Sequence, residues 1–90
     1  MEKSYSYPID LEWSREDMVR VIDLWRAVEL AYETGIDREL FLKKYQAFKQ
    51  VIPAIGEEKK WGREFQQLSS YSLYKVVQEA KTSTKKNIHM

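Results

Sequence analysis

The chain contains no cysteine, which excludes disulfides, thiolate nucleophiles and cysteine-based metal sites. It has only three glycines and two prolines, and so few turn-forming residues favour long helices over a strand-rich fold. No apolar run approaches the roughly 18 residues that indicate a membrane-spanning helix. The first residues also lack the charged and apolar regions of a secretion signal. The sequence therefore predicts a cytoplasmic protein with no membrane association.

The chain also lacks the residues that most catalytic and metal sites need. Its one histidine is His89, and nothing in the polar segment around it holds the side chain for acid–base catalysis or zinc binding. Glu29 and Glu33 share one helix face, but the Glu-x-x-His motifs of helical metal sites are missing. We interpret this pair as a solvated helix face. The sequence thus predicts no catalytic, metal or cofactor-binding residue, and we do not expect an enzyme.

Apolar and polar side chains alternate in residues 4–13, which we call the N-terminal arm. The apolar positions are Tyr5, Tyr7, Ile9, Leu11 and Trp13, and a period of two places them all on one face of an extended backbone. No later stretch repeats this pattern, so the arm has no evident strand partner. Its apolar face must be buried on this chain's own helices or on a second copy of the protein.

Over most of the remaining chain, apolar side chains recur at steps of three and four, which is typical of amphipathic helices. Ser14 with Asp17 resembles a capping box, Gly35 suits a left-handed helix end, and Pro53 ends the second helix. The short connection through Asp37 predicts that the first two helices pack antiparallel. We predict an all-α fold, a compact irregular bundle of about four helices with the extended N-terminal arm. The expected helices are approximately residues 15–34, 38–52, 57–68 and 71–81.

The same spacing assigns the apolar helix faces. The face of the second helix begins at Leu40, and that of the third comprises Trp61, Phe65 and Leu68. Gly62 lies in the middle of the third helix, where it costs roughly 1 kcal/mol relative to alanine. Its small size also leaves room for another element to approach closely.

Residues 82–90 are polar and have no apolar period. Such a segment cannot bury enough apolar surface to offset the entropy of ordering it. We therefore predict a single helical domain over residues 1–81, which includes the arm, followed by a flexible tail at 82–90.

Charge is divided unevenly along the chain. Residues 9–40 hold nine acids and four bases, whereas residues 41–90 hold ten bases and four acids. The simplest interpretation is that the two halves face each other and partly neutralise. The alternative is a basic surface for nucleic acid or for an acidic partner. Bases also flank Trp61, an arrangement that can bind phosphates and stack on bases, but its register with Phe65 favours a core position.

The sequence resembles a known family over most of residues 4–81. The stretches that carry the resemblance are Ser4-Tyr-Ser-Tyr-Pro-Ile-Asp-Leu-Glu-Trp-Ser14, Ala31-Tyr-Glu-Thr-Gly35, Tyr45-x-x-Phe48-Lys49, Glu58-Lys59 and Tyr71-Ser72-x-Tyr74-x-Val76-Val77. They are similar to the YktA-like uncharacterised protein family, short cytosolic proteins of Gram-positive bacteria. That family has a glycine where this chain has Ser70, which implies a less tight turn into the last helix here. The resemblance implies a small all-helical fold and no assigned activity, catalytic residue or ligand.

The function is therefore unknown from sequence, and a structural or protein-interaction role is the leading hypothesis. In its specific form, the five apolar residues of the arm contribute to a homodimer contact, since about nine extended residues span some 30 Å. In the alternative form, the arm packs on its own chain. A weak nucleic-acid-binding role for the basic half is the second hypothesis.

Overall fold

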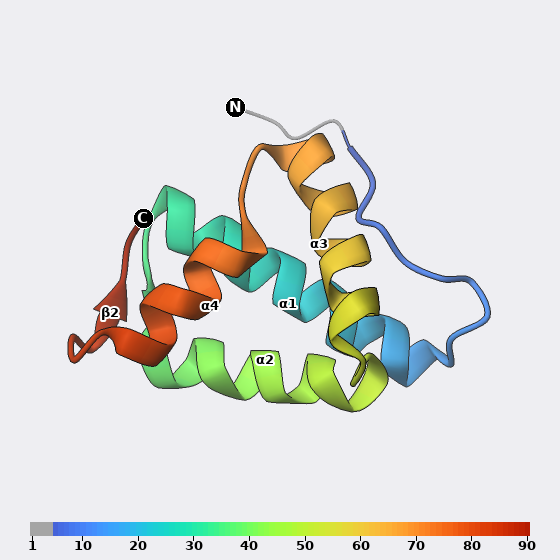
Figure 1. Ribbon diagram of the computed structural model, residues 1–90, viewed down its shortest axis with the longest axis horizontal. Helices are drawn as coiled ribbons and strands as arrows, with labels where there is room; N and C mark the ends of the chain where they lie inside the picture. The colour runs from blue at the N-terminus through green and yellow to red at the C-terminus, as the bar shows by residue number, and fades with distance from the viewer. Residues whose placement is uncertain (1–4) are drawn as a thin grey trace.

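The computed structural model describes residues 5–90, which form four helices and one short antiparallel strand pair (Figure 1). The elements in chain order are α1 (Arg15–Glu33), β1 (Ile36–Asp37), α2 (Arg38–Val51), α3 (Ile55–Ser69), α4 (Leu73–Thr82) and β2 (Asn87–Ile88). The predicted all-α fold with four helices is thus confirmed, and each helix boundary lies within two residues of its predicted position. Residue 4 of the arm and the three residues before it lie outside the described part.

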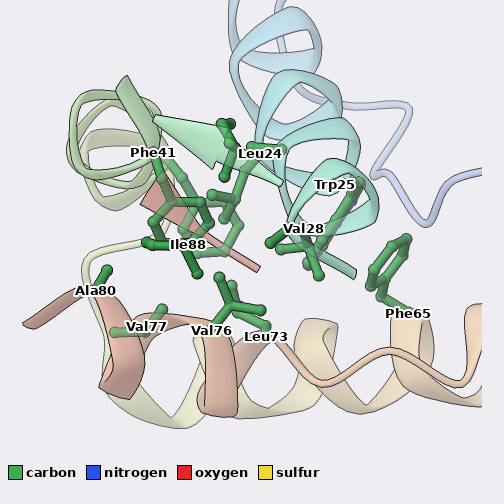
Figure 2. Packing of buried hydrophobic residues seen from close by; sticks show 14 of the residues in the cluster. Leu24, Trp25, Val28, Phe41, Phe65, Leu73, Val76, Val77, Ala80 and Ile88 are labelled. Carbon is green, nitrogen blue, oxygen red and sulfur yellow. The ribbon is translucent and has the colours of Figure 1, made fainter. Parts of the chain in front are cut away.

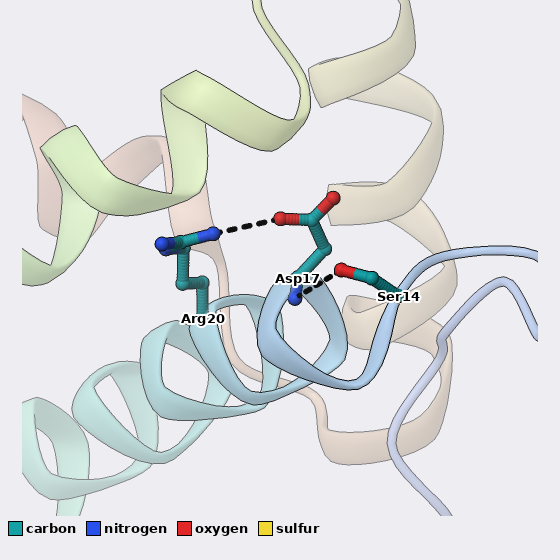
Figure 3. A network of polar contacts seen from close by, with 3 residues as sticks. All are labelled: Ser14, Asp17 and Arg20. Carbon is teal, nitrogen blue, oxygen red and sulfur yellow. Dashed lines mark hydrogen bonds and ion pairs between the residues drawn. The ribbon is translucent and has the colours of Figure 1, made fainter.

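Local signals place both ends of α1. At its start, the Ser14 hydroxyl accepts a hydrogen bond from the Asp17 N–H at 3.1 Å, and the Asp17 carboxylate pairs with Arg20 at 2.8 Å (Figure 3). At its end, Gly35 has φ +97°, and its N–H donates to the Leu30 carbonyl at 2.6 Å. Only glycine adopts this left-handed conformation without strain, so the predicted helix start and stop are both confirmed.

The core lies between α1, α2 and α4, and α3 closes one end of it (Figure 2). Phe65 of α3 stacks on the Trp25 ring of α1 at a centroid distance of 4.7 Å, and Phe48 of α2 meets the same ring edge-on at 5.6 Å. Aromatic pairs at these separations stabilise a core beyond the area that they bury. The largest fully buried side chains are Trp25, Phe41, Phe48, Phe65, Leu24, Ile52 and Ile88.

Residues 82–90 depart from the predicted flexible tail. Asn87–Ile88 pairs antiparallel with Ile36–Asp37, which places Ile88 opposite Ile36. The Ile88 side chain is only 1% exposed, and the Met90 N–H donates to the Ala31 carbonyl at 2.8 Å. One buried isoleucine and a few backbone hydrogen bonds hold the segment, so it carries no apolar period that the sequence could reveal. His89 follows β2 and is exposed.

Two of the side chains assigned to apolar helix faces, Leu40 and Leu68, are exposed. Leu40 precedes the fully buried Phe41, and adjacent helical residues point about 100° apart. Leu68 lies in the last turn of α3, three residues beyond the buried Phe65. The apolar stripes of α2 and α3 are therefore narrower than the sequence pattern predicts.

Ser70 ends α3 in a conformation that is uncommon for a residue with a side chain. Its φ is 69°, in the left-handed region, and its N–H donates to the Gln66 carbonyl at 2.7 Å. Left-handed backbone costs a non-glycine residue roughly 1–2 kcal/mol. The turn is therefore as tight as a glycine would allow, which corrects the expectation of a looser turn at Ser70.

Candidate functional site

The N-terminal arm is anchored to α1 through Glu29. The Tyr5 hydroxyl donates a hydrogen bond to Glu29 Oε2, and the Tyr7 hydroxyl donates to Glu29 Oε1 at 2.7 Å. Glu29 is only 6% exposed, so the interpretation of its carboxylate as part of a solvated face is wrong. Hydrogen bonds to an ionised acceptor are stronger than neutral ones, and they offset the cost of burying this charge.

The arm lies along α3 as well as α1 (Figure 1). The rings of Tyr5 and Tyr7 have their centroids 6.3 and 6.4 Å from that of Phe65. One residue further on, the Pro8 carbonyl accepts a hydrogen bond of 3.0 Å from the indole N–H of Trp25. Ring packing and hydrogen bonds therefore hold the first half of the described arm against its own helices.

The second half of the arm breaks the predicted alternation. The Asp10 carboxylate accepts from the Glu12 N–H at 2.9 Å, and the Asp10 carbonyl accepts from the Trp13 N–H at 3.1 Å. This aspartate-supported turn leaves Leu11 81% exposed. It also brings the ring centroid of Trp13 to 5.0 Å from that of Trp61. The prediction that all five apolar residues share one buried face is therefore wrong at Leu11.

Of the five residues predicted for an interaction surface, four pack against this chain's core: Tyr5, Tyr7, Ile9 and Trp13. Their arrangement is that of the alternative in which the arm packs on its own chain. Leu11 alone remains exposed. The homodimer hypothesis thus loses most of the apolar surface on which it depended.

Burial and Glu29 together change the acidity of the arm tyrosines. Burial first, and then the hydrogen bond to the Glu29 carboxylate, raises the pKa of Tyr7 to about 12. The same causes raise the pKa of Tyr5 further. Both hydroxyls therefore stay protonated, as donors to Glu29, beyond the pH at which an ordinary tyrosine ionises.

The raised pKa of Tyr7 predicts a loss of stability at alkaline pH. Its contribution is fully present below pH 10, the ordinary value, and is lost as pH rises through about 12. We expect the free energy of unfolding, measured by urea denaturation at a series of pH values, to fall over this range. The free energy of unfolding of the Tyr7→Phe variant should fall less steeply with pH. The Tyr74→Phe variant, changed at an exposed tyrosine, should keep the wild-type slope. Equal slopes for all three proteins would contradict the prediction.

A second buried carboxylate ties α2 to α3. Glu58 accepts hydrogen bonds from the Tyr45 hydroxyl at 2.8 Å and from Lys49 Nζ at 2.6 Å. It lies in the first turn of α3 as predicted, where the helix dipole favours negative charge. Burial, followed by the hydrogen bond to Glu58, raises the pKa of Tyr45. Sequence reasoning found the helix start but not these cross-helix partners.

A groove of about 410 Å³ lies beside this cluster, between α3 and α4, with Tyr45 of α2 at one side. Its walls are mainly apolar. One face of α3 contributes the lining residues at steps of three and four: Ile55, Glu58, Lys59, Gly62, Arg63 and Gln66. From α4 come Ser72 at its N-cap, Leu73, Tyr74, Val77, Gln78 and Lys81.

Gly62 of α3 faces the Leu73 side chain of α4. A Cβ at Gly62 would lie 3.6 Å from Leu73 Cδ2, an ordinary contact distance. A side chain would therefore fit at this position, and the expectation that the small size of Gly62 lets α4 approach unusually closely is not met. Ile55 and Tyr74 border the groove and are 63% and 68% exposed, which gives it an apolar rim that no other described residue covers.

The structure divides the basic and aromatic residues near Trp61 between two surfaces. Trp61 packs on Trp13, and Lys60 Nζ lies 5.3 Å from the centre of the Trp61 ring. Lys59 and Arg63 instead line the groove. Lys59 and Arg63 therefore lie away from the Trp61 ring, while Lys60 lies against it.

Within residues 5–90, no three acidic, histidine or cysteine side chains gather where they could hold a metal ion. Over the same residues, no helix combines the length and apolar character needed to cross a membrane. The features that stand out are thus the two buried carboxylates and the apolar groove.

The fold defines a small four-helix domain with an N-terminal arm packed on it, and comparison with known proteins places it in a family. Residues 4–89 match the uncharacterised protein family UPF0223, and the chain belongs to that family. It is 51% identical over 90 residues to a UPF0223 protein of Streptococcus sanguinis, covering 100% of this chain and 98% of the relative. It is 54% identical over 79 residues to one from Enterococcus faecalis, covering 88% and 86% of the two chains. A Listeria monocytogenes UPF0223 protein is 49% identical over 86 residues, covering 96% of each chain.

These matches confirm the family resemblance seen in the sequence, and the relatives are proteins of Gram-positive bacteria. The family is uncharacterised, so membership brings no activity, ligand or partner. A functional hypothesis must therefore come from the surface of this chain.

Proposed function

We propose that the protein is a non-catalytic protein-interaction domain of the bacterial cytoplasm, and that the groove between α3 and α4 receives its partner. The observation that carries this proposal is the mainly apolar groove with Ile55 and Tyr74 exposed on its rim. Apolar side chains gathered around a hollow are costly to leave in water, and such surfaces mark interaction sites.

This proposal moves the interaction surface away from the N-terminal arm. Four of the five apolar side chains of the arm pack on this chain's core, so they offer little apolar area to a partner. Leu11 is exposed but stands alone, and single exposed apolar residues are normal on protein surfaces. The groove instead combines several apolar side chains from three helices.

A weak nucleic-acid-binding role is the second candidate. It is favoured by three cationic side chains at the groove, Lys59, Arg63 and Lys81. Phosphate binding through these residues predicts an affinity that falls steeply with salt. The mainly apolar walls fit a protein partner better, because phosphates gain nothing from apolar surface.

Site-specific photocrosslinking in living bacteria tests the proposed function. A photoreactive amino acid at position 74 should give covalent adducts with another protein, because Tyr74 borders the groove and is exposed. The same amino acid at position 39, an exposed residue in the first turn of α2, should give far fewer. Mass spectrometry of the adducts distinguishes a protein partner from nucleic acid. Equal adducts at both positions, or none at position 74, would contradict the proposal.

A further inference from the structure

We infer that the occupant of the groove is an acidic amphipathic helix, with its apolar side in the groove and its carboxylates against Lys59, Arg63 and Lys81. This inference rests on the proposed function and adds the chemistry of the partner.

The charges at the groove favour an acidic partner. Its charged lining residues are three bases and one acid, Glu58. The Glu58 carboxylate is already paired with Lys49 Nζ at 2.6 Å. Among residues 5–90, none of the three bases has a carboxylate within ion-pair distance. The groove therefore presents uncompensated positive charge, and electrostatic complementarity requires an occupant that is negative at its edges.

At least one of these cations is held in place before a partner arrives. Lys81 Nζ lies 5.6 Å from the centre of the Tyr45 ring, within the range of a cation–π interaction. The Tyr45 hydroxyl is in turn fixed by its 2.8 Å hydrogen bond to Glu58. Less side-chain freedom is then lost on binding, and such preorganisation favours affinity.

The direction of the lining residues favours a helix over an irregular segment. The α3 wall runs along one helix face from Ile55 to Gln66, and the 11 helical steps between these residues span roughly 16 Å at 1.5 Å per step. The α4 wall follows with Tyr74, Val77 and Lys81 at helical spacing. A partner helix of about three turns matches this length, and apolar residues at i, i+4 and i+7 would enter the groove between the cations.

A displayed library of helical peptides of about 15 residues provides the probe. Each peptide carries random apolar residues on one face and either Glu or Lys at the flanking positions. The library is selected against the full-length protein. We expect Glu-flanked peptides to be enriched over Lys-flanked ones, and their affinity to fall as salt is raised.

Matched variants locate the binding. Lys59→Glu with Arg63→Glu should weaken selected peptides about tenfold or more, because like charges then face each other. The control is Lys43→Glu with Lys75→Glu, which changes the net charge equally at exposed helical positions outside the groove lining. Ile55→Ser with Tyr74→Ser removes the apolar rim at exposed positions, so the domain should still fold, as thermal unfolding can verify.

The outcomes separate the inference from the proposed function. Loss of binding in both the charge-reversed and rim variants, but not in the control, supports both. If the selected peptides need Ile55 and Tyr74 but tolerate charge reversal, the inference of an acidic partner is overturned, while the proposed function of the groove as an interaction site stands. Peptides that bind the rim variant as well as wild type overturn both. Charge-sensitive binding of RNA or DNA without any peptide, or charge-sensitive self-association, assigns the groove to nucleic acid or to a second copy and overturns the inference.

Discussion

Replacing Trp25 with alanine is expected to lower the free energy of unfolding by about 3–5 kcal/mol. The Trp25 side chain is fully buried, stacks on Phe65 and meets Phe48 edge-on. It also donates a hydrogen bond to the Pro8 carbonyl, so its removal loosens the arm as well as the core. Because small domains are stabilised by only about 5–15 kcal/mol in total, much of the population should unfold at modest urea concentrations. Urea denaturation followed by circular dichroism measures the change.

Trp25→Phe is the matched control for this prediction. It keeps an aromatic ring in the core but leaves the buried Pro8 carbonyl without its donor, and the expected loss from the missing hydrogen bond is about 1–3 kcal/mol. The smaller ring of phenylalanine adds to this loss. We still expect Trp25→Ala to lower the free energy of unfolding more than Trp25→Phe does. A loss below about 1 kcal/mol for Trp25→Ala would show that the ring is not the centre of the core.

Replacing Glu29 with alanine is expected to cost about 2–3 kcal/mol, which is large for a single carboxylate. Two tyrosine hydroxyls lose a charged acceptor at once. Part of the cost is recovered because both hydroxyls are only partly buried and can turn to water. The same urea experiment measures the loss. Protease cleavage within residues 5–13 should also become faster, since the arm loses its attachment to α1.

Glu33→Ala is the control for Glu29→Ala. Glu33 lies one turn further along α1 and accepts a 2.7 Å hydrogen bond from the Tyr71 hydroxyl, but it is exposed. Its removal should cost less than about 1 kcal/mol. A double-mutant cycle with Tyr7→Phe should show that the two losses at Glu29 and Tyr7 do not add. Fully additive losses would mean that the hydrogen bond contributes little.

The helices could be predicted from sequence because their signals are local. The hydroxyl of Ser14, the left-handed Gly35 and the carboxylate of Asp37 each act within a few residues of the helix end that they define. The spacing of the apolar residues then indicates which residues between these ends are helical. These signals do not depend on how the helices are placed relative to one another, so they are visible without a structure.

The burial of Glu29 could not be predicted in this way, because it depends on a distant segment. The apolar stripe of α1 faces α2 and α4, while the arm covers another side of the same helix and brings Tyr5 and Tyr7 to the carboxylate. A signal did exist, since two hydroxyls spaced two residues apart on an apolar face need acceptors. The sequence gives no means of choosing Glu29 over the other acids.

The groove and the β2 pairing were missed for the same physical reason. The groove depends on how α3 and α4 are placed relative to each other after the left-handed turn at Ser70. The β2 strand depends on the single buried side chain of Ile88. Neither feature produces a periodic pattern in the sequence. The groove residues therefore have the composition of an ordinary helix surface, and the residues around β2 have that of a flexible tail.

The contact between Trp13 and Trp61 gives this protein an internal optical reporter. The two indole rings lie 5.0 Å apart and come from the end of the arm and from α3, close enough for their electronic transitions to couple in near-ultraviolet dichroism. Trp25, by contrast, is fully buried in the core. The dichroism of the Trp13–Trp61 pair can thus report detachment of the arm in unlabelled protein.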